Sequence, residues 1–472
     1  MTLSSKDEAA QSAARPPCRL FAMRASPITS YAADAAFDAA FRHAGVIRAE
    51  GSEEVFDWAR ALAWCPLPRG PRMAILTNGG GPGAIAADAL EANGLELAAL
   101  SERVRRELEQ MLPPAASVRN PVDALASAGP AEFAGCLRVL LGDEGVDGVM
   151  VILPPPPMTT AEVARAVIPN IRSAVKPVVM VLMGEDLIVQ AARLLRQAHV
   201  PDYRFPERAA SAMRVLVERA RQLERPSDVP RRPRGIRREA AGEILLSAPP
   251  GSDRFLDAGA SAEIVAAYGV RTPASVLARN AGEAIEAAHR LGFPVVLKVA
   301  SPDIPHKSDF GGVALGLRDD EALGRAFGRV TSDPLAASPK ARIRGVWVQE
   351  DLAPGQEVIV GVVRDPQFGP LVMFGSGGVE VEELKDVAFA LAPLTTVEAE
   401  HLLEETWVGR RLRGYRNLAP ADRTAAVDVI VRLGQLAVDF PQITEVEMNP
   451  LRGHSQGKGA VALDARVRVE VG

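Results

Sequence analysis

Three features within residues 292–317 suit phosphate chemistry. Lys298 interrupts the apolar run 295–299, and a lysine in such a strand is costly to bury unless an anion meets it. His306 follows in a His-Lys-Ser-Asp segment, and Gly311 and Gly312 precede a second strand, where bare backbone N–H groups could approach a polyphosphate. Each feature also has a simpler interpretation: a lysine at a sheet edge, a surface histidine and a hairpin turn. Together they favour a nucleotide site.

Acidic and amide side chains near the end of the sequence could hold a metal ion. Glu445, Glu447 and Asn449 alternate along a predicted strand, so all three project from one face. Asp464 lies on the next predicted strand, across a turn, and can converge with them. A small set of oxygen ligands suits Mg²⁺, which also takes waters and substrate phosphates. An acidic strand face is often simply solvated, but the neighbouring Lys298 and glycine pair favour the metal interpretation.

The elements that must position these residues form a predicted α+β domain over residues 252–472. Helical patterns around 260–268 and 283–291 precede the strand of Lys298. After Arg344 the hydrophobic period changes to two, which predicts antiparallel strands, including one at 357–363. A second glycine turn lies within 373–383. Helices at 396–412 and 421–440 and strands at 443–451 and 460–465 complete the expected domain.

Residues 71–225 predict a separate doubly wound α/β domain. A strand at 73–77, a glycine turn at 78–83 and a helix at 84–93 are followed by strands at 148–153 and 177–183, each leading into a helical pattern. The turn reads GGGPG rather than GxGxxG, and no acidic residue ends a strand about 20 residues later, which disfavours a dinucleotide site. The helix N-terminus could hold an anion, or the glycines could serve close packing.

The remaining segments carry weaker patterns. Residues 1–25 show no period and predict a ragged start, and residues 31–63 predict two helices appended to the domain that follows. Residues 226–251 are rich in proline and arginine and predict an interdomain linker, whose arginines we interpret as a solvated tether.

Composition excludes several classes of protein. A length of 472 residues predicts several domains, and a net charge of -5 without a basic excess argues against nucleic-acid binding. Cys18, Cys65 and Cys136 form no CxxC pair, which argues against a disulfide framework or a zinc site and fits a reducing, cytoplasmic location. No apolar run approaches 18 residues and no signal sequence is evident, so we expect neither a membrane span nor secretion.

Several motifs together resemble one enzyme family. GFPVVLKVASPDIPHKSDFGGV, FGSGGVEVEELKDVAF, EVEMNPL and LDAR make residues 252–472 similar to the ATP-grasp domain of the NDP-forming (ADP-forming) acyl-CoA synthetases, relatives of succinyl-CoA synthetase. LTNGGGPGAIAADALE and SVRNPVD make residues 71–225 similar to the flavodoxin-like domain of fused members. The resemblance implies an α/β fold, with a flavodoxin-like doubly wound domain followed by an ATP-grasp domain.

The resemblance also implies an activity: acid, CoA and ATP give acyl-CoA, ADP and phosphate through a phosphohistidine, with Mg²⁺ as cofactor. His306 matches the loop-borne phosphohistidine of the family, and the helix after GGGPG would supply half of a dipole cradle for a phosphohistidine. The other roles carried over by motif are phosphate binding by Lys298 beside Gly311 and Gly312, adenine contacts by Gln349 and Glu350, a ribose contact by Glu357, and metal binding by Asn449 and Asp464 with Glu447 beside them.

Departures from the family pattern shape the functional hypotheses. The resemblance implies that residues 1–70 hold only a helical remnant of a phosphohistidine-type domain, that the CoA-binding domain is absent, and that the primary histidine position falls near Ser26. A family arginine is Ala390 here, and the last glycine of a GYRG segment is Asn417. The first hypothesis is therefore an ATP-grasp component that needs a partner subunit for CoA binding. The second is a catalytically degenerate ATP-binding or regulatory paralogue, and a carboxylate–amine ligase is less favoured. The residues do not select the acid.

Overall fold

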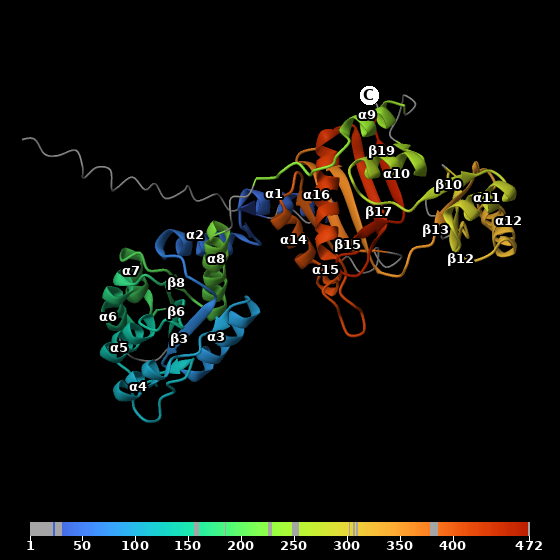
Figure 1. Ribbon diagram of the computed structural model, residues 1–472. Helices are drawn as coiled ribbons and strands as arrows, with labels where there is room; N and C mark the ends of the chain where they lie inside the picture. The colour runs from blue at the N-terminus through green and yellow to red at the C-terminus, as the bar shows by residue number, and fades with distance from the viewer. Residues whose placement is uncertain are drawn as a thin grey trace, which may run out of the picture. The chain divides into compact units, whose positions relative to one another are not determined.

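Parallel strands, most of them fully buried, form the centre of residues 45–227 in the computed structural model (Figure 1). The strand order is β4-β3-β6-β7-β8, and the short β5 also pairs with β3. In chain order this is 2-1-3-4-5, the order of flavodoxin-like folds, so the predicted fold class of this region is confirmed. The bounds are β3 (Arg72–Thr77), β4 (Glu96–Leu97), β5 (Val122–Asp123), β6 (Gly148–Leu153), β7 (Val178–Leu182) and β8 (Asp202–Tyr203).

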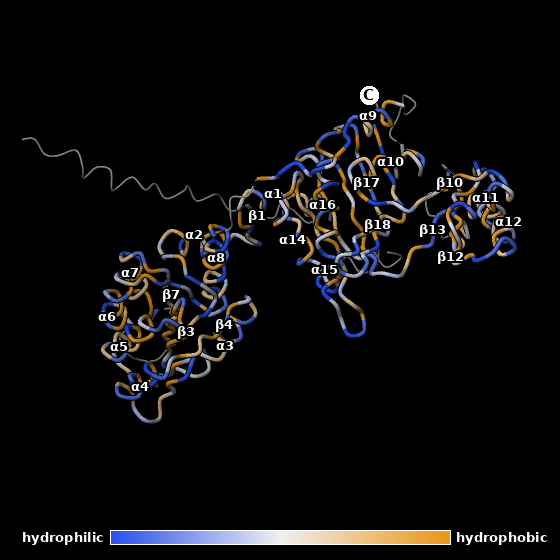
Figure 2. The backbone as a smooth tube through the Cα atoms, in the orientation of Figure 1, coloured by the Kyte–Doolittle hydropathy of each residue, from blue (hydrophilic) through white to orange (hydrophobic). Residues whose placement is uncertain are grey.

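Helices cover both faces of this sheet because the strands present apolar side chains on each face. Ala74 and Leu76 pack toward α4–α7, whereas Met73 and Ile75 pack toward α2, α3 and α8. Figure 2 shows the hydrophobic strands inside the shell of more hydrophilic helices. The bounds are α2 (Ser52–Trp64), α3 (Gly80–Ala92), α4 (Glu102–Met111), α5 (Pro130–Leu141), α6 (Thr160–Ser173), α7 (Val189–Gln197) and α8 (Pro206–Glu224).

The structure describes residues 22–23, 31–154, 160–184, 186–224, 229–247, 254–301, 303–304, 307, 310–377 and 386–470. The chain divides into two units, one containing residues 45–227 and the other containing residues 28–44 and 228–472. Within the described ranges, no helix has the length and apolar character needed to cross a membrane.

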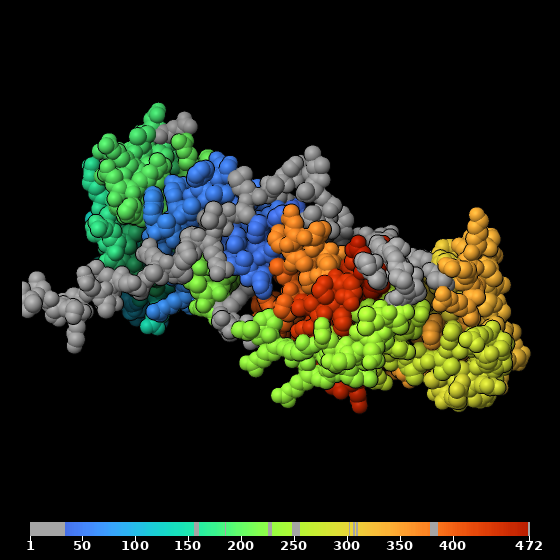
Figure 3. All heavy atoms as spheres, turned by 90° about the horizontal axis from the view of Figure 1, so that it is seen from above, coloured from blue at the N-terminus to red at the C-terminus, as the bar shows by residue number. Residues whose placement is uncertain are grey.

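The second unit contains a small lobe built on an antiparallel sheet of order β10-β13-β11-β12. Its strands are β10 (Ser275–Ala278), β11 (Val295–Ala300), β12 (Val313–Leu317) and β13 (Gly345–Glu350). Helices α11 (Ala281–Leu291) and α12 (Asp320–Ala337) cover one face, where Leu297, Val299, Val346 and Val348 are buried. Because side chains alternate across a strand, Lys298 and Trp347 project from the opposite face. Figure 3 shows this lobe, yellow to orange, as a distinct body within the second unit.

A larger sheet of order β16-β15-β14-β17-β19-β9 forms the rest of the second unit, with β18 paired to β17. Its strands are β9 (Arg254–Phe255), β14 (Gln356–Asp365), β15 (Gly369–Ser376), β16 (Val387–Leu391), β17 (Ile443–Gly453), β18 (Ala460–Ala462) and β19 (Ala465–Val469). Helices α9 (Arg238–Leu246), α10 (Ala258–Ala267), α14 (Thr396–Glu405), α15 (Trp407–Arg411) and α16 (Arg423–Asp439) contribute to its core. The two-sheet α+β arrangement agrees with the expected ATP-grasp fold class.

Three segments differ from the sequence-based expectations. The proposed linker 226–251 contains α9, whose Ala241 and Leu245 are buried in the core of the second unit. The helix expected over 396–412 is two helices, because Thr406 is extended and its hydroxyl caps α15 by accepting from Gly409 N at 3.0 Å. The two helices expected within 31–63 form, but they belong to different units: α1 (Tyr31–Ala44) packs on β16, and α2 packs on α8. A short parallel pair joins β1 (Ala22–Met23) to β2 (Arg48–Ala49).

Candidate functional site

A cavity of about 760 Å³ lies in the second unit, lined by both of its sheets. Its lining comes from β9 and α10, from the strands of the small lobe, and from β17 and β19 of the larger sheet. A pocket of about 20 Å³ adjoins it and is lined by Lys298, Lys307, Gln349, Leu463 and Asp464, among others. The structure therefore gathers Lys298, Gln349 and Asp464, three of the predicted site residues, around one small space.

Lys298 reaches this pocket from the middle of β11. Its Nζ donates to the backbone oxygen of Leu463 at 2.7 Å. Burial lowers the pKa of the Lys298 ammonium from its ordinary 10.5, and the nearby Asp464 carboxylate opposes that shift. A buried ammonium whose carboxylate neighbour is shared with a second lysine leaves positive charge for an anion to balance.

Asp464 follows β18 and holds that second lysine. Its Oδ2 lies 2.7 Å from Lys307 Nζ, and its Oδ1 accepts from Ala465 N at 3.1 Å. The Lys307 and Asp464 side chains are 11% and 26% exposed, so this pair is largely withdrawn from water. Sequence reasoning missed Lys307, although it stands next to His306 in the motif that drew attention to the histidine.

The acidic row on β17 faces away from the core, as the alternation predicted. Val446 and Met448 are buried, whereas Glu445, Glu447 and Asn449 lie on the other side of the strand and are partly exposed. Asn449 Nδ2 donates to Glu447 Oε1 at 3.3 Å. The two carboxylates also face arginines of β19, with 3.6 Å from Glu447 to Arg466 and 3.5 Å from Glu445 to Arg468.

These oxygen donors are of the chemical types that a magnesium ion takes. Glu447 lies opposite Arg466 across the β17–β19 pair, and Leu463 N donates to Pro450 O at 3.0 Å, so Asn449 and Asp464 stand at adjoining positions. Hard carboxylate and amide oxygens in a small, incomplete set are what Mg²⁺ takes when substrate phosphates complete its coordination. In the part of the chain that the structure describes, no group of three or more His, Cys, Asp or Glu residues could hold a metal. The fit therefore depends on the Asn449 amide together with two carboxylates.

Gly311 and Gly312 precede β12, beside the strand that carries Lys298. Gly311 has φ of 68°, in the left-handed region that favours glycine. Gly312 N donates to Lys307 O at 2.8 Å, and a Cβ on Gly312 would meet Val299 Cγ1 at 2.6 Å. The requirement for glycine at 312 is therefore steric, and this residue fixes the backbone of Lys307.

The remaining predicted residues lie in different surroundings. Glu350 at the end of β13 uses its Oε1 to accept from Ala274 N at 3.0 Å and lines neither cavity. Glu357 on β14 forms a two-nitrogen contact with Arg452 of β17, at 3.1 Å from Nε and 2.7 Å from Nη2. Both Glu357 and Arg452 influence the pKa of Lys298 and so lie near it. His306 lies outside the described residues.

Aromatic and arginine side chains of the cleft also escaped the sequence analysis. Trp347 lines both cavities and packs on α10, where a Cβ on Gly259 would meet its Cη2 at 2.9 Å. Arg466 stacks on the ring of Phe255, with 4.4 Å from its guanidinium carbon to the ring centroid. The period-two pattern could have indicated that Trp347 shares a face with Lys298. The pairing of β9 with β19 could not be read from a local pattern, because it joins segments about 210 residues apart in the sequence.

Comparison with known proteins places both units in a family. A Ligase-CoA domain matches residues 73–224, and an ATP-grasp domain matches residues 248–469. The chain is 39% identical over 432 residues to acetate–CoA ligase [ADP-forming] I of Archaeoglobus fulgidus, covering 90% of this chain and 61% of that protein. It is 39% identical over 230 residues to the beta subunit of acetate–CoA ligase [ADP-forming] I of Pyrococcus furiosus, covering 49% of this chain and 98% of that subunit.

Among solved structures, an acetyl-coenzyme A synthetase 1 of Ca. Korarchaeum cryptofilum is 36% identical, with a TM-score of 0.46 over 49% of this chain and 99% of that one. The chain spans about three-fifths of the Archaeoglobus protein and nearly the whole of the Pyrococcus beta subunit. On these matches it belongs to the family of ADP-forming acyl-CoA ligases, with a Ligase-CoA domain in its first unit and an ATP-grasp domain in its second.

Proposed function

We propose that this chain binds ATP and transfers its γ-phosphoryl group as part of an ADP-forming acyl-CoA ligase. The overall reaction would convert a small carboxylic acid, CoA and ATP into acyl-CoA, ADP and phosphate, or run in reverse. The observation that carries the nucleotide part is the buried Lys298 ammonium, 2.7 Å from Leu463 O and beside Asp464, in a cleft between two sheets. The names of the relatives, ADP-forming acetate–CoA ligases, support the reaction class.

Each predicted residue has a role consistent with its surroundings. Lys298 would pair with phosphate oxygens, and Gln349 on the same face of the small sheet would contact the base. Glu447, Asn449 and Asp464 would hold Mg²⁺, which when bound offsets negative charge on the transferring phosphoryl group. Glu350 and Glu357 remain proposed base and ribose contacts, and their carboxylates also contact Ala274 and Arg452.

His306 remains the proposed acceptor of the phosphoryl group. A neutral imidazole nitrogen would form the new N–P bond while the bond from the γ-phosphorus to the bridging oxygen breaks, and ADP would leave with that oxygen. The phosphoryl group would then pass through the primary phosphohistidine to the acid, whose acyl phosphate yields acyl-CoA and free phosphate when the CoA thiolate attacks. Water takes no part as a nucleophile in this sequence.

We propose that CoA binding and the primary phosphohistidine are supplied outside these 472 residues. The chain covers 61% of the fused Archaeoglobus relative, and the Pyrococcus relative is a beta subunit, so the same activity is divided between chains in that organism. A partner chain, or a longer form of this one, would complete the cycle.

Titration calorimetry with ATP and Mg²⁺ tests the nucleotide part. Lys298→Met should weaken ATP binding about 100-fold, because it removes the buried charge that balances phosphate. Lys340→Met, at an exposed lysine of the same unit, should bind like wild type. Absence of heat with wild type would refute the proposal.

Radiolabelled ATP tests the phosphoryl step. Wild type should acquire acid-labile label that His306→Ala lacks, and equal labelling of both proteins would remove His306 from the mechanism. Addition of a candidate CoA-binding partner, CoA and short acids should then give thioester.

A second candidate function, an ATP-binding regulatory paralogue without acyl-CoA chemistry, is favoured by one observation. Ala390 replaces a family arginine, and in β16 it packs against the apolar core of the second unit, opposite Val372. No charge is therefore available at that position. Thioester formation with any partner would exclude this alternative. Nucleotide binding without thioester formation, whichever candidate partner and acid are added, would support it.

A further inference from the structure

Lys307 occupies a position that a bound cation would need. Its Nζ lies 2.7 Å from Asp464 Oδ2, while Oδ1 of the same carboxylate is held by Ala465 N–H at 3.1 Å. The outward oxygen of Asp464 is therefore already neutralised by a cation that belongs to the protein. A divalent ion on Oδ2 and an ammonium in hydrogen-bond contact with the same oxygen would repel each other, so each weakens the binding of the other.

Lys307 also forms part of the wall between the two cavities. Four described residues line both the 760 Å³ cavity and the 20 Å³ pocket: Ala258, Lys307, Trp347 and Ala465. The two alanines have no side chain to swing aside, and Trp347 packs on Gly259. The small pocket has room for about one water molecule, so a phosphate group beside Lys298, Gln349 and Asp464 needs more space than the pocket offers in this arrangement of its wall.

A hydrogen bond from Gly312 holds the backbone oxygen of Lys307, whereas the Lys307 side chain can change rotamer. Gly312 N donates to Lys307 O at 2.8 Å, and any Cβ at 312 would come within 2.9 Å of that oxygen. The four-carbon stem of a lysine can change rotamers without moving its Cα. The ammonium can therefore leave Asp464 while the chain around Gly312 keeps its position.

We propose that the Lys307 ammonium is a built-in stand-in for the divalent cation and neutralises Asp464 when no cation is bound. Cation binding displaces the ammonium and joins the small pocket to the large cavity. This inference rests on the proposed function, which assigns a divalent cation to Asp464. Two consequences follow: Lys307 gives the Asp464 carboxylate a hydrogen-bonded cationic partner when no metal is bound, and it competes with the metal.

Metal binding without nucleotide tests the competition directly. Mn²⁺ takes the same hard oxygen ligands as Mg²⁺ and is counted by its electron paramagnetic resonance signal. Lys307→Met should bind Mn²⁺ about tenfold more tightly than wild type, because the competing charge is gone. Lys307→Arg, which keeps the charge, should bind no more tightly than wild type, and Lys340→Met should equal it. Equal or weaker binding by Lys307→Met overturns the proposal.

A double-mutant cycle assigns the effect to Asp464. In an Asp464→Asn background, the tighter binding caused by Lys307→Met should disappear, and a gain that persists there would show that Lys307 acts elsewhere and overturn the proposal. Lys307→Gln, with circular dichroism to establish folding, gives a second neutral variant should the methionine variant misfold. Calorimetry with Mg-ATP distinguishes failure of this proposal from failure of the proposed function. If wild type binds Mg-ATP but Lys307→Met leaves the Mn²⁺ affinity unchanged, the proposed function stands and the role of Lys307 as a stand-in for the cation is refuted.

Discussion

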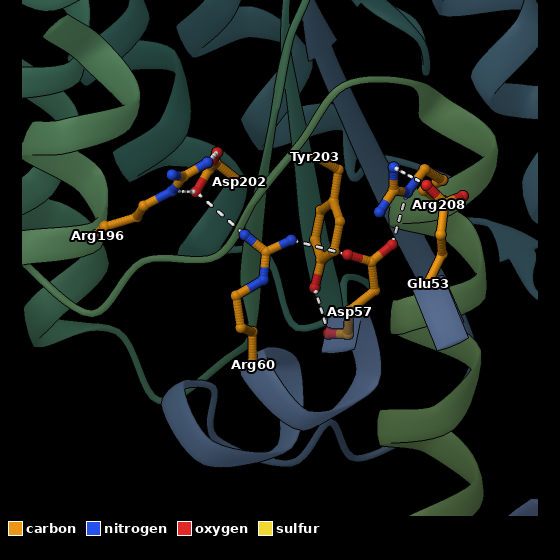
Figure 4. Close-up of polar contacts among 7 residues, drawn as sticks. All are labelled: Glu53, Asp57, Arg60, Arg196, Asp202, Tyr203 and Arg208. Atoms are coloured by element: carbon orange, nitrogen blue, oxygen red, sulfur yellow. Dashed lines mark hydrogen bonds and ion pairs between the residues drawn. The ribbon is translucent and has the colours of Figure 1, made fainter. Parts of the chain in front are cut away.

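Each unit contains a cluster of buried charges, and the two clusters are compensated in opposite ways. In the first unit, Asp57 and Asp202 are 3% and 6% exposed, and arginines from several elements surround them (Figure 4). In the second unit, Lys298 and Lys307 lie near the carboxylate of Asp464, and Arg452 and Glu357 also act on Lys298. The first cluster has a fixed partner for each carboxylate, and the second has more positive than negative charge at its centre.

Each aspartate of the arginine cluster accepts hydrogen bonds from arginines of the same cluster. Asp57 accepts from Arg60 at 2.7 Å and from Arg208 at 2.6 Å, and Asp202 accepts two bonds from Arg196 at 2.8 Å each. Arg60 also reaches Asp202 at 3.5 Å, so it joins the two carboxylates and ties α2 to β8. The hydrogen bonds to their aspartates raise the pKa values of Arg196 and Arg208.

Burial acts in the opposite direction on Lys298, whose pKa falls. A cluster whose partners stabilise the charged form of each side chain contributes to folding stability. A cluster in which burial disfavours the charged form is less stable by itself, and an oppositely charged ligand can offset that cost when it binds. The comparison shows that burial of a charged side chain does not by itself distinguish a structural role from a ligand-binding role. The balance between the charge and its partners distinguishes them. Four variants or conditions test this contrast, from the largest expected effect to the smallest.

Asp57→Ala should cause the largest loss of stability. It leaves Arg60 and Arg208 without their main partner, and we expect the free energy of unfolding to fall by about 2–3 kcal/mol, below the upper end for buried pairs because both arginines reach water. Denaturant unfolding measures the change. Asp88→Ala, on the exposed side of α3, is the control, and equal losses for the two variants would contradict the structural role.

Arg60→Met should cost less, about 1 kcal/mol, because each aspartate keeps another arginine: Arg208 for Asp57 and Arg196 for Asp202. The same unfolding measurement applies. A loss as large as that of Asp57→Ala would mean that Arg60 alone holds the cluster together.

Lys298→Met should leave the nucleotide-free protein as stable as wild type or up to about 1 kcal/mol more stable, because an incompletely compensated buried charge is replaced by an apolar side chain. Thermal or denaturant unfolding without nucleotide measures this, with Lys340→Met as the control. Destabilisation by several kcal/mol would place Lys298 in the same structural category as Asp57.

The pH dependence of stability should show the smallest effect. The Lys298 pKa is below 10.5 in the folded chain, so between the two pKa values the unfolded chain binds more protons and wild-type stability rises with pH. Any stability advantage of Lys298→Met should therefore shrink as the pH approaches 10.5. An advantage that is constant from neutral pH to that value would show that the lysine's charge is not its cause.

Local patterns predicted most of the fold. The strand of Lys298, expected at 295–299, is Val295–Ala300, and the strand expected at 148–153 is Gly148–Leu153. These runs are apolar, short and bounded by turns, so their own residues decide the conformation. The failures also have local causes: the proline and arginine content of 226–251 hid the helical spacing of Ala241 and Leu245, and Thr406 ends one helix while capping the next.

The candidate site was predictable in its residue types and less so in its pairings. The strand alternation correctly placed Glu445, Glu447 and Asn449 on one face. The contact of Lys307 with Asp464 joins positions 157 residues apart, and that of Lys298 with Leu463 joins positions 165 apart. Such pairings depend on how the small lobe meets the larger sheet, which no local period encodes.

The helix α1 has a practical consequence for dividing the chain. Ala36 and Ala39 are buried with Leu371, and the ring of Phe37 meets that of Phe368 at 5.0 Å, so a segment that precedes the Ligase-CoA domain belongs to the second unit. A fragment that begins at residue 228 would lack this helix and expose the apolar side chains of Leu371, Phe389 and Leu391, so we expect it to self-associate. The second unit is thus discontinuous in sequence, and the Ligase-CoA domain lies between its two segments.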